Sequence, residues 1–149
     1  MTYTELKDEL YLVRERERII DARLKSLATL KDDYLARLNN GVTDYSRDAI
    51  QKSRDPDAAL VAVIDDLNRD TDKLIASIKE LREANEYYKG LILSSKDIGG
   101  EVLRLFFLER LSMKKVSKTL SYAEKYTWKL WRQAIEELTE VINNENSKA

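Results

Sequence analysis

The side chains with the clearest chemistry are basic ones gathered near the carboxyl end of the chain. Between Arg110 and Arg132 there are seven basic residues and one acidic residue, a net charge of +6. The whole 149-residue sequence has a net charge of only −1, so the remainder of the chain carries −7. Ammonium and guanidinium groups bind phosphate, and this stretch therefore predicts a phosphate-binding face. A lysine-rich helix surface that meets only solvent would give the same pattern.

Catalytic and metal-binding chemistry has little support in the sequence. The chain has no Cys and no His, which excludes thiol nucleophiles, disulfides, Cys/His zinc sites and imidazole acid–base catalysis. The adjacent carboxylates Asp32–Asp33 and Asp65–Asp66 do not face each other on a helix and make poor acid–base pairs. We therefore expect no enzyme, no cofactor and no bound metal.

The composition favours long helices to hold these basic side chains. Four Gly and one Pro are few for a chain of this length, and 36% of the residues are charged. Such a composition predicts an all-α fold. No apolar run approaches the roughly 18 residues of a membrane-spanning helix, and the polar start does not resemble a signal peptide. We expect a cytoplasmic protein that does not bind membranes.

Residues 3–39 carry the pattern of a coiled-coil helix. Thr2 and Glu5 have the spacing of a capping box, which predicts the helix start. Apolar residues then recur every three or four positions. They are Tyr3, Leu6, Leu10, Val13, Ile20, Leu24, Leu27, Tyr34 and Leu38. Asn39, Asn40 and Gly41 favour a helix end, so we predict an irregular connector over residues 40–55.

A second heptad series predicts a helix over residues 56–92. Asp55 followed by Pro56 is a strong helix start, because proline lacks the N–H that would be unpaired there. The two helices can satisfy each other as an antiparallel hairpin over residues 1–93, or each can pair with a second copy in a homodimer. Thr71 and Asn85 are polar members of the seam, which either fix the register or oligomeric state or are chance substitutions.

Residues 96–145 predict a small helical domain with three helices. The apolar stretch from Val102 to Leu111 is too hydrophobic for a surface helix and should be the hub of a core. Ser112 can cap a short helix that buries Met113, Val116 and Leu120. After a turn at Ser121–Tyr122, a longer helix from about Ala123 should bury one face and end near Ile142. The residues of that face are Thr127, Leu130, Ala134, Ile135, Leu138 and Val141. Residues 146–149 are expected to be a disordered tail.

A short helix, a tight turn and a longer helix with basic side chains in its first turns give the spacing of a helix-turn-helix. The predicted site for double-stranded DNA comprises Lys114, Lys115, Lys118, Glu124, Lys125, Trp128, Lys129 and Arg132. The lysines of the first helix are placed for phosphates, and those of the second for base edges or phosphates. Glu124 can accept from a cytosine amino group. The helical phase exposes Trp128 and buries Trp131.

Residues 101–135 resemble the C-terminal helix-turn-helix of sigma factors, known as region 4, which reads the upstream promoter element. Leu111, Ser112, Val116, Leu120 and Ala134–Ile135 match its pattern. The whole chain is similar to small helical phage and prophage proteins grouped with late transcriptional regulators. The resemblance implies a DNA-binding transcription regulator in the cytoplasm of a bacterial host, with RNA polymerase as a possible partner.

Three positions depart from the sigma pattern. Ser121 stands where glycine is usual, Ala123 where a Ser or Thr cap is usual, and Trp128 where a polar or basic residue is usual. These departures keep a second hypothesis open, in which a phage-encoded helical module binds a host nucleic-acid-processing protein. A third hypothesis, a small subunit of a packaging enzyme, requires ring-shaped oligomers that nothing in the sequence predicts.

Overall fold

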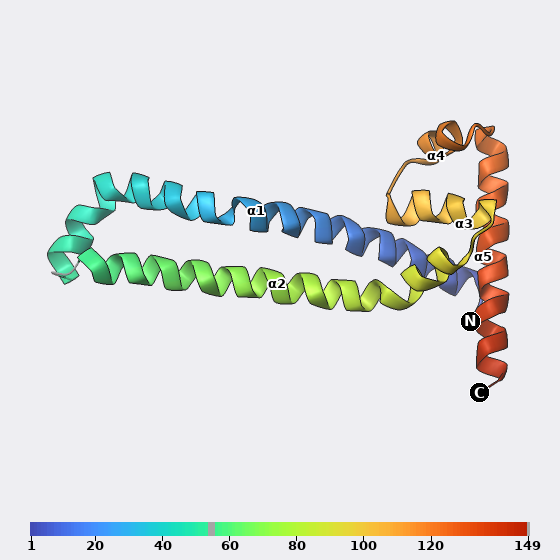
Figure 1. Ribbon diagram of the computed structural model, residues 1–149, viewed down its shortest axis with the longest axis horizontal. Coiled ribbons are helices and arrows are strands. Elements are labelled where there is room, and N and C mark those ends of the chain that lie inside the picture. The colour runs from blue at the N-terminus through green and yellow to red at the C-terminus, as the bar shows by residue number, and fades with distance from the viewer. Residues whose placement is uncertain (54–55, 149) are drawn as a thin grey trace. The chain divides into compact units, whose positions relative to one another are not determined.

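The computed structural model describes the backbone of residues 1–53 and 56–148, and the side chains outside 39–57. Helices are the only regular secondary structure in this part of the chain, which confirms the predicted all-α fold. Its elements are α1 (Tyr3–Ser53), α2 (Pro56–Ser94), α3 (Ile98–Leu103), the π-helical turn η1 (Arg104–Leu108), α4 (Met113–Leu120) and α5 (Glu124–Ser147), labelled in Figure 1.

The chain divides into two compact units. One consists of Met1–Ile19 and Leu81–Ala149, and the other of Ile20–Glu80. Within each unit, α1 and α2 lie side by side and antiparallel, as the predicted hairpin requires (Figure 1). The sequence pattern predicts the boundary between the hairpin and the C-terminal domain at residues 93–96. In the structure the ends of the hairpin belong to the C-terminal unit, because Leu6, Leu10 and Ile92 share one core with the C-terminal helices.

Helix α1 begins as predicted but continues further. The Thr2 Oγ1 atom accepts a hydrogen bond from the Glu5 backbone N–H at 3.2 Å, which caps the first turn. The helix then runs to Ser53, so the connector predicted over 40–55 is wrong for residues 40–53; residues 54–55 lie outside the described part. Asn and Gly permit a left-handed helix end but do not impose one. A proline does interrupt the helical hydrogen bonds, because it lacks a backbone N–H, and Pro56 is the only proline of the chain.

In the larger unit, the predicted seam is buried. Leu6, Leu10 and Val13 of α1 have no exposed surface, and Ile92 of α2 is 1% exposed. Asn85 is buried in the same seam and donates from Nδ2 to the Val13 carbonyl oxygen at 3.2 Å. A buried amide with a backbone partner in the opposite helix favours one register over its neighbours.

In the Ile20–Glu80 unit the two helices bury less. Ile20 and Ile78 are buried, but the seam residues Leu24, Leu60 and Ile64 are about 40% exposed or more. Tyr34 donates a hydrogen bond from its hydroxyl to the Asp70 carboxylate. Two helices cover only one side of each other, so partial exposure of the apolar seam is expected in a two-helix pair.

The core of the larger unit is centred on α3 and η1, as the apolar stretch predicts. Five residues of this stretch are buried, including the consecutive Leu105, Phe106 and Phe107. Three consecutive buried residues need neighbours on several sides of the helix. Tyr11 of α1 packs edge-on against Phe107, and Trp131 of α5 stacks on the same ring.

Helix α3 is held close to the chain before it. Asp97 caps α3 by accepting from the Gly100 N–H at 2.8 Å. A Cβ atom at Gly100 would lie 2.1 Å from the Ser95 carbonyl oxygen, so only glycine fits there. At Gly99 a Cβ atom would lie 3.0 Å from the Cβ of Ala134 in α5. These glycines therefore let α3 approach its neighbours. Gly90 lies inside α2 with open space around it.

Two residues with positive φ bracket α4. Arg110, at φ 59°, ends η1 and lets the Leu111 N–H bond the Leu105 carbonyl at 3.0 Å. Ser121, at φ 61°, ends α4, and the Tyr122 N–H then bonds the Ser117 carbonyl at 2.9 Å. The left-handed conformation costs a non-glycine residue roughly 1–2 kcal/mol. A glycine at the position of Ser121 would adopt this conformation without that cost.

Helix α5 buries the predicted face with one exception. Val141 is 43% exposed and Ile142 is buried instead, because a step of four from Leu138 keeps the 3.6-residue period better than a step of three. The helix also continues to Ser147, so the disordered tail predicted over 146–149 is wrong for residues 146–147. No Gly or Pro follows Ile142 to end the helix sooner. Residue 149 lies outside the described part.

Candidate nucleic-acid interface

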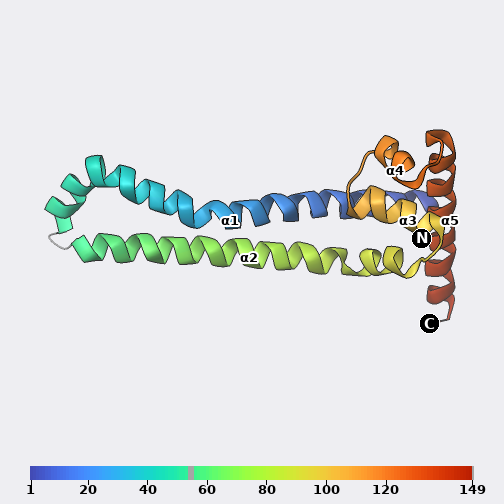
Figure 2. The same cartoon turned by 45° about the horizontal axis from the view of Figure 1, so that its top comes forward.

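Helices α4 and α5 form the predicted helix-turn-helix. Ser112 caps α4 by accepting from the Lys115 N–H at 3.3 Å, as predicted, and Met113 and Val116 are buried. Leu120 is partly buried against the core. Helix α4 packs against the N-terminal half of α5 (Figures 1 and 2). The tight turn at Ser121 therefore sets the angle between two helices that both contact the core.

The three lysines of α4 are on its solvent side. Lys114, Lys115 and Lys118 are exposed, while Met113, Val116 and Ser117 on the opposite side are buried. Lys115 and Lys118 are three residues apart and so lie one turn from each other. Their ammonium groups are available to an anion that approaches α4 from solvent.

The basic residues of α5 share its outward face. Lys125, Lys129 and Arg132 are exposed and follow steps of four and three, which keeps them on one side of the helix. Thr127, Leu130 and Ala134 occupy the opposite, buried side. The structure therefore brings these three cations into one row along the first turns of α5. Glu124 is exposed in the first turn.

The charges of α5 change sign along the helix. The basic residues end at Arg132, and the exposed residues after it include Glu136, Glu137, Glu140 and Glu145. Basic residues near a helix N-terminus and acidic residues near its C-terminus both oppose the helix macrodipole. The arrangement of most α5 charges is therefore unfavourable for the helix alone. It confines any anion-binding surface to the N-terminal half of α5.

The first turn of α5 lacks a side-chain cap. Ala123 occupies the N-cap position with an extended backbone, and it makes no side-chain hydrogen bond. The carbonyl oxygen of Ala123 accepts from the backbone N–H of Thr127 at 3.0 Å and from its hydroxyl at 2.9 Å. Unpaired N–H groups at a helix N-terminus attract phosphate oxygens.

Trp128 lies on the flank of α5 and not in the middle of its basic row. The residue is 40% exposed, and its ring packs edge-to-face with Phe106 at 5.8 Å and with Trp131 at 5.3 Å between ring centroids. Trp131 is buried, as predicted. Within the described part of the chain its Nε1 has no hydrogen-bond partner. Trp128 thus contacts the core with one side of its ring and solvent with the other.

The N-terminal residue contacts the C-terminal part of α5. Asn143 of α5 donates from Nδ2 to the Met1 carbonyl oxygen at 3.0 Å. At 1.5 Å per residue, Asn143 lies roughly 27 Å along the helix from Lys125. Tyr11 of α1 also contacts Trp131 of α5, yet Lys125, Lys129 and Arg132 remain exposed, which is the condition that the DNA-binding hypothesis requires.

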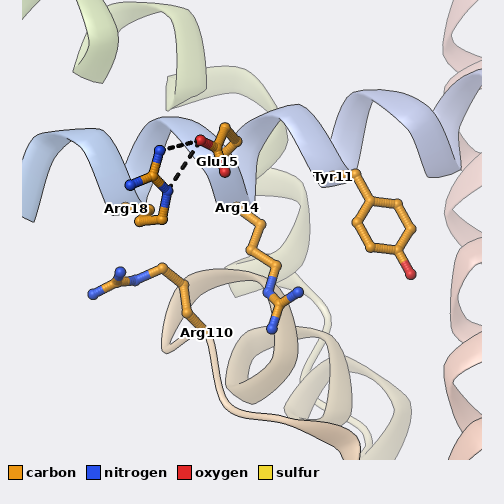
Figure 3. Close-up of a pocket in the computed structure, with 5 residues that line it drawn as sticks. All are labelled: Tyr11, Arg14, Glu15, Arg18 and Arg110. Carbon is orange, nitrogen blue, oxygen red and sulfur yellow. Dashed lines mark hydrogen bonds and ion pairs between the residues drawn. The ribbon is translucent and has the colours of Figure 1, made fainter.

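Two groups of side chains were not predicted as site residues. Tyr122 and Tyr126, exposed at the start of α5, form an edge-to-face pair with 5.4 Å between ring centroids. Arg14 and Arg18 of α1 line a pocket with Arg110 (Figure 3). The tyrosine pair has a sequence signal in its spacing of four residues. The arginines have no such signal, because about ninety residues of sequence separate Arg18 from Arg110.

Comparison of the chain with protein-family models, curated proteins and solved structures found no match. What this surface binds must therefore be inferred from its residues and their geometry. In the described part of the chain, no group of acidic residues is arranged to hold a metal ion. Within residues 1–53 and 56–148, no helix has both the length and the apolar character needed to cross a bilayer.

Proposed function

We propose that this protein binds double-stranded DNA through α4 and the N-terminal half of α5. The observation that carries the proposal is a row of exposed cations, Lys125, Lys129 and Arg132, on the outward face of the second helix of a helix-turn-helix. The major groove admits one α-helix, and the first turns of that helix reach the base edges. The lysines of α4 are then available to the flanking phosphates.

The charge reversal along α5 supports the same orientation. A duplex that contacted the C-terminal half would meet Glu136, Glu137 and Glu140, which repel phosphates. A duplex at the N-terminal half meets the basic row, the positive end of the helix dipole and unpaired backbone N–H groups. The proposed contacts therefore involve the first three turns of α5.

The resemblance to region 4 of sigma factors extends this proposal to transcription. On that basis we propose a phage or prophage regulator that acts in the cytoplasm of a bacterial host, with RNA polymerase as a second partner. The hairpin of α1 and α2 would serve as a spacer or as a dimerisation arm. The support for this extension is the sequence pattern of residues 101–135 together with the helix-turn-helix geometry.

The test is the salt dependence of binding to duplex DNA, measured by fluorescence anisotropy. Each phosphate neutralised adds about 0.9 to the slope of log affinity against log salt concentration. The double variant Lys125→Ala/Lys129→Ala should reduce the slope by about 2 and weaken binding at every salt concentration. The control is Lys25→Ala/Lys31→Ala, which removes the same charge from exposed positions of α1. A dissociation constant weaker than about 10 μM at low salt for every duplex tried would reject the proposal.

A second candidate function is favoured by the aromatic side chains beside the basic row. Tyr122, Tyr126 and Trp128 are all 40% exposed or more. Exposed tyrosine and tryptophan beside arginine are typical of protein-interface hot spots. In this proposal the helical module captures a host nucleic-acid-processing protein. It is supported if Trp128→Ala abolishes a stoichiometric, nuclease-resistant complex and the protein gives no DNA footprint.

A further inference from the structure

Two tyrosines at the start of α5 form an exposed aromatic pair. Tyr122 directly precedes the N-cap residue Ala123, and Tyr126 lies in the first turn of the helix. The two tyrosines are 41% and 46% exposed. Their rings meet edge to face, with 5.4 Å between the centroids and 64° between the planes. Because the rings are in contact, the pair presents one apolar surface to solvent.

The backbone on both sides of the pair is fixed by the fold. Ser121 has a φ of 61° and ends α4, and the Tyr122 N–H donates to the Ser117 carbonyl oxygen at 2.9 Å. Tyr126 is followed in α5 by Thr127, which has no exposed surface. A surface that is arranged before its ligand arrives loses less conformational entropy on binding. The pair is therefore suited to recognise a ligand and not only to cover the turn.

The helical phase places the pair beside the basic row. Tyr126 and Lys129 are three residues apart and are neighbours on the exposed surface of α5. At about 100° per residue, Tyr126 borders the row on one side and Trp128 borders it on the other. Lysine is depleted in protein–protein interfaces, whereas DNA offers a phosphate to an ammonium group and a base edge to a ring. The lysines next to the pair therefore favour DNA over a protein partner.

The major groove of DNA offers one apolar group to such a surface. Every base pair presents hydrogen-bond donors and acceptors there, and thymine alone adds a C5 methyl group. Apolar and aromatic side chains recognise thymine by contact with this methyl group. The contact removes apolar area of both partners from water, which is favourable. A tyrosine ring in the groove therefore distinguishes thymine from uracil, which carries only hydrogen at C5.

We propose that the Tyr122–Tyr126 pair contacts the C5 methyl group of a thymine in the major groove, so that the protein prefers thymine-containing sites. The contact rests on the function proposed above, which places the first turns of α5 at the base edges. It divides the work on this helix, because the neighbouring lysines supply charge and the tyrosines supply selectivity. An apolar contact is not screened by ions, so the preference should not depend on salt concentration.

The test compares two duplexes of equal length that differ only in methyl groups. One has alternating dA and dT, and the other has deoxyuridine in place of every thymidine, which keeps the phosphates and the base-pair hydrogen bonds. The wild-type protein should bind the thymine duplex about fourfold more tightly, the effect of burying roughly one methyl group. The slope of log affinity against log salt concentration should be the same for both duplexes. Fluorescence anisotropy measures the two dissociation constants, starting at low salt.

Substitutions within the pair assign the preference to these residues. Tyr126→Ala should bring the ratio of the two affinities to about one, whereas Tyr126→Phe keeps the ring and should keep the ratio. Any effect of the missing methyl groups on DNA shape persists in Tyr126→Ala and is thereby separated from the contact. The matched control is Tyr87→Ala. It removes a 52% exposed tyrosine from a second edge-to-face pair, with Tyr88, in the same compact unit, and should change neither affinity.

The outcomes separate this contact from the DNA-binding function. Equal affinity of the wild type for both duplexes overturns the thymine contact and leaves DNA binding by α4 and α5 in place. A preference that Tyr122→Ala and Tyr126→Ala both leave unchanged overturns the assignment to the pair. Binding of neither duplex at low salt rejects the contact and the function together. Loss of a nuclease-resistant protein complex in Tyr126→Ala would then assign the pair to the second candidate function.

Discussion

The Nδ2 atom of Asn85 in α2 donates to the Val13 carbonyl oxygen of α1, with 3.2 Å between nitrogen and oxygen. The same nitrogen also lies 3.2 Å from Glu17 Oε1, and the Asn85 amide oxygen is 3.5 Å from Arg16 Nη1. All of these contacts cross between the two antiparallel helices. The Asn85 amide therefore has partners for both its nitrogen and its oxygen, which favours the prediction that Asn85 fixes the register over a chance substitution.

Two substitutions of Asn85 should distinguish its effect on stability from its effect on the register of α1 and α2. Asn85→Ala loses the hydrogen bonds and leaves a small cavity, and should lower the free energy of unfolding by about 2 kcal/mol. Asn85→Leu should raise Tm while it allows shifted pairings or dimers, because an apolar seam no longer distinguishes registers. Circular dichroism and light scattering measure the two effects. Equal stability of Asn85→Ala and wild type would contradict the role given to the amide.

Gly100→Ala should strongly destabilise the larger unit. The added Cβ would meet the Ser95 carbonyl oxygen at 2.1 Å, and this backbone atom cannot move without breaking the start of α3. We expect a loss of about 3 kcal/mol or more in urea unfolding. Gly90→Ala is the control, since its Cβ meets nothing within 4 Å. This change within α2 should stabilise the protein by about 0.5–1 kcal/mol. A mild effect of Gly100→Ala would contradict this prediction, because it would show that the backbone at Ser95 can move without disrupting the start of α3.

Ala123→Ser should stabilise α5. A serine hydroxyl at this N-cap position can accept one of the unpaired N–H groups of the first turn, which is worth about 1 kcal/mol. The reverse change at the neighbouring helix, Ser112→Ala, removes an observed cap and should lower stability by a similar amount. Chemical denaturation of the two variants gives both values. No gain from Ala123→Ser would mean that the first turn already has other partners.

The Tyr34–Asp70 hydrogen bond should make stability depend on pH in the alkaline range. The bond to the Asp70 carboxylate raises the pKa of Tyr34 above its ordinary value of 10.0. A raised folded-state pKa gives stability that is present below pH 10 and is lost as pH rises through the raised value. Tyr34→Phe should therefore be less stable than wild type at pH 7, and the difference should vanish at higher pH. A difference that persists there, or survives in an Asp70→Asn background, would contradict this origin.

Much of the fold follows from local patterns in the sequence. The heptad seams, the caps at Thr2 and Ser112, the left-handed turn at Ser121 and the buried face of α5 are all set by neighbouring residues. Helix ends were harder to predict. The helical continuation past Gly41 shows that a weak stop signal is overridden when no proline accompanies it.

The candidate site also contains residues that local spacing predicts and residues that only tertiary packing brings together. Cations within one helix, such as Lys125 and Lys129, could be placed by spacing alone. The flank position of Trp128 required knowledge of Phe106, because a helical wheel does not show which neighbour covers a residue at the edge of the buried face. The pocket of Arg14, Arg18 and Arg110 depends on tertiary packing between distant segments, for which local periodicity contains no information.

The two tryptophans of the chain give it a built-in optical probe. Their rings lie 5.3 Å apart at 80°, one buried and one open to solvent, within the proposed DNA-binding domain. Acrylamide should quench the fluorescence of Trp128 and spare that of Trp131, and a ligand seated on the flank of α5 should shield the first without altering the second. Emission spectra of the unlabelled protein can thus distinguish occupancy of this surface from unfolding of the core beneath it.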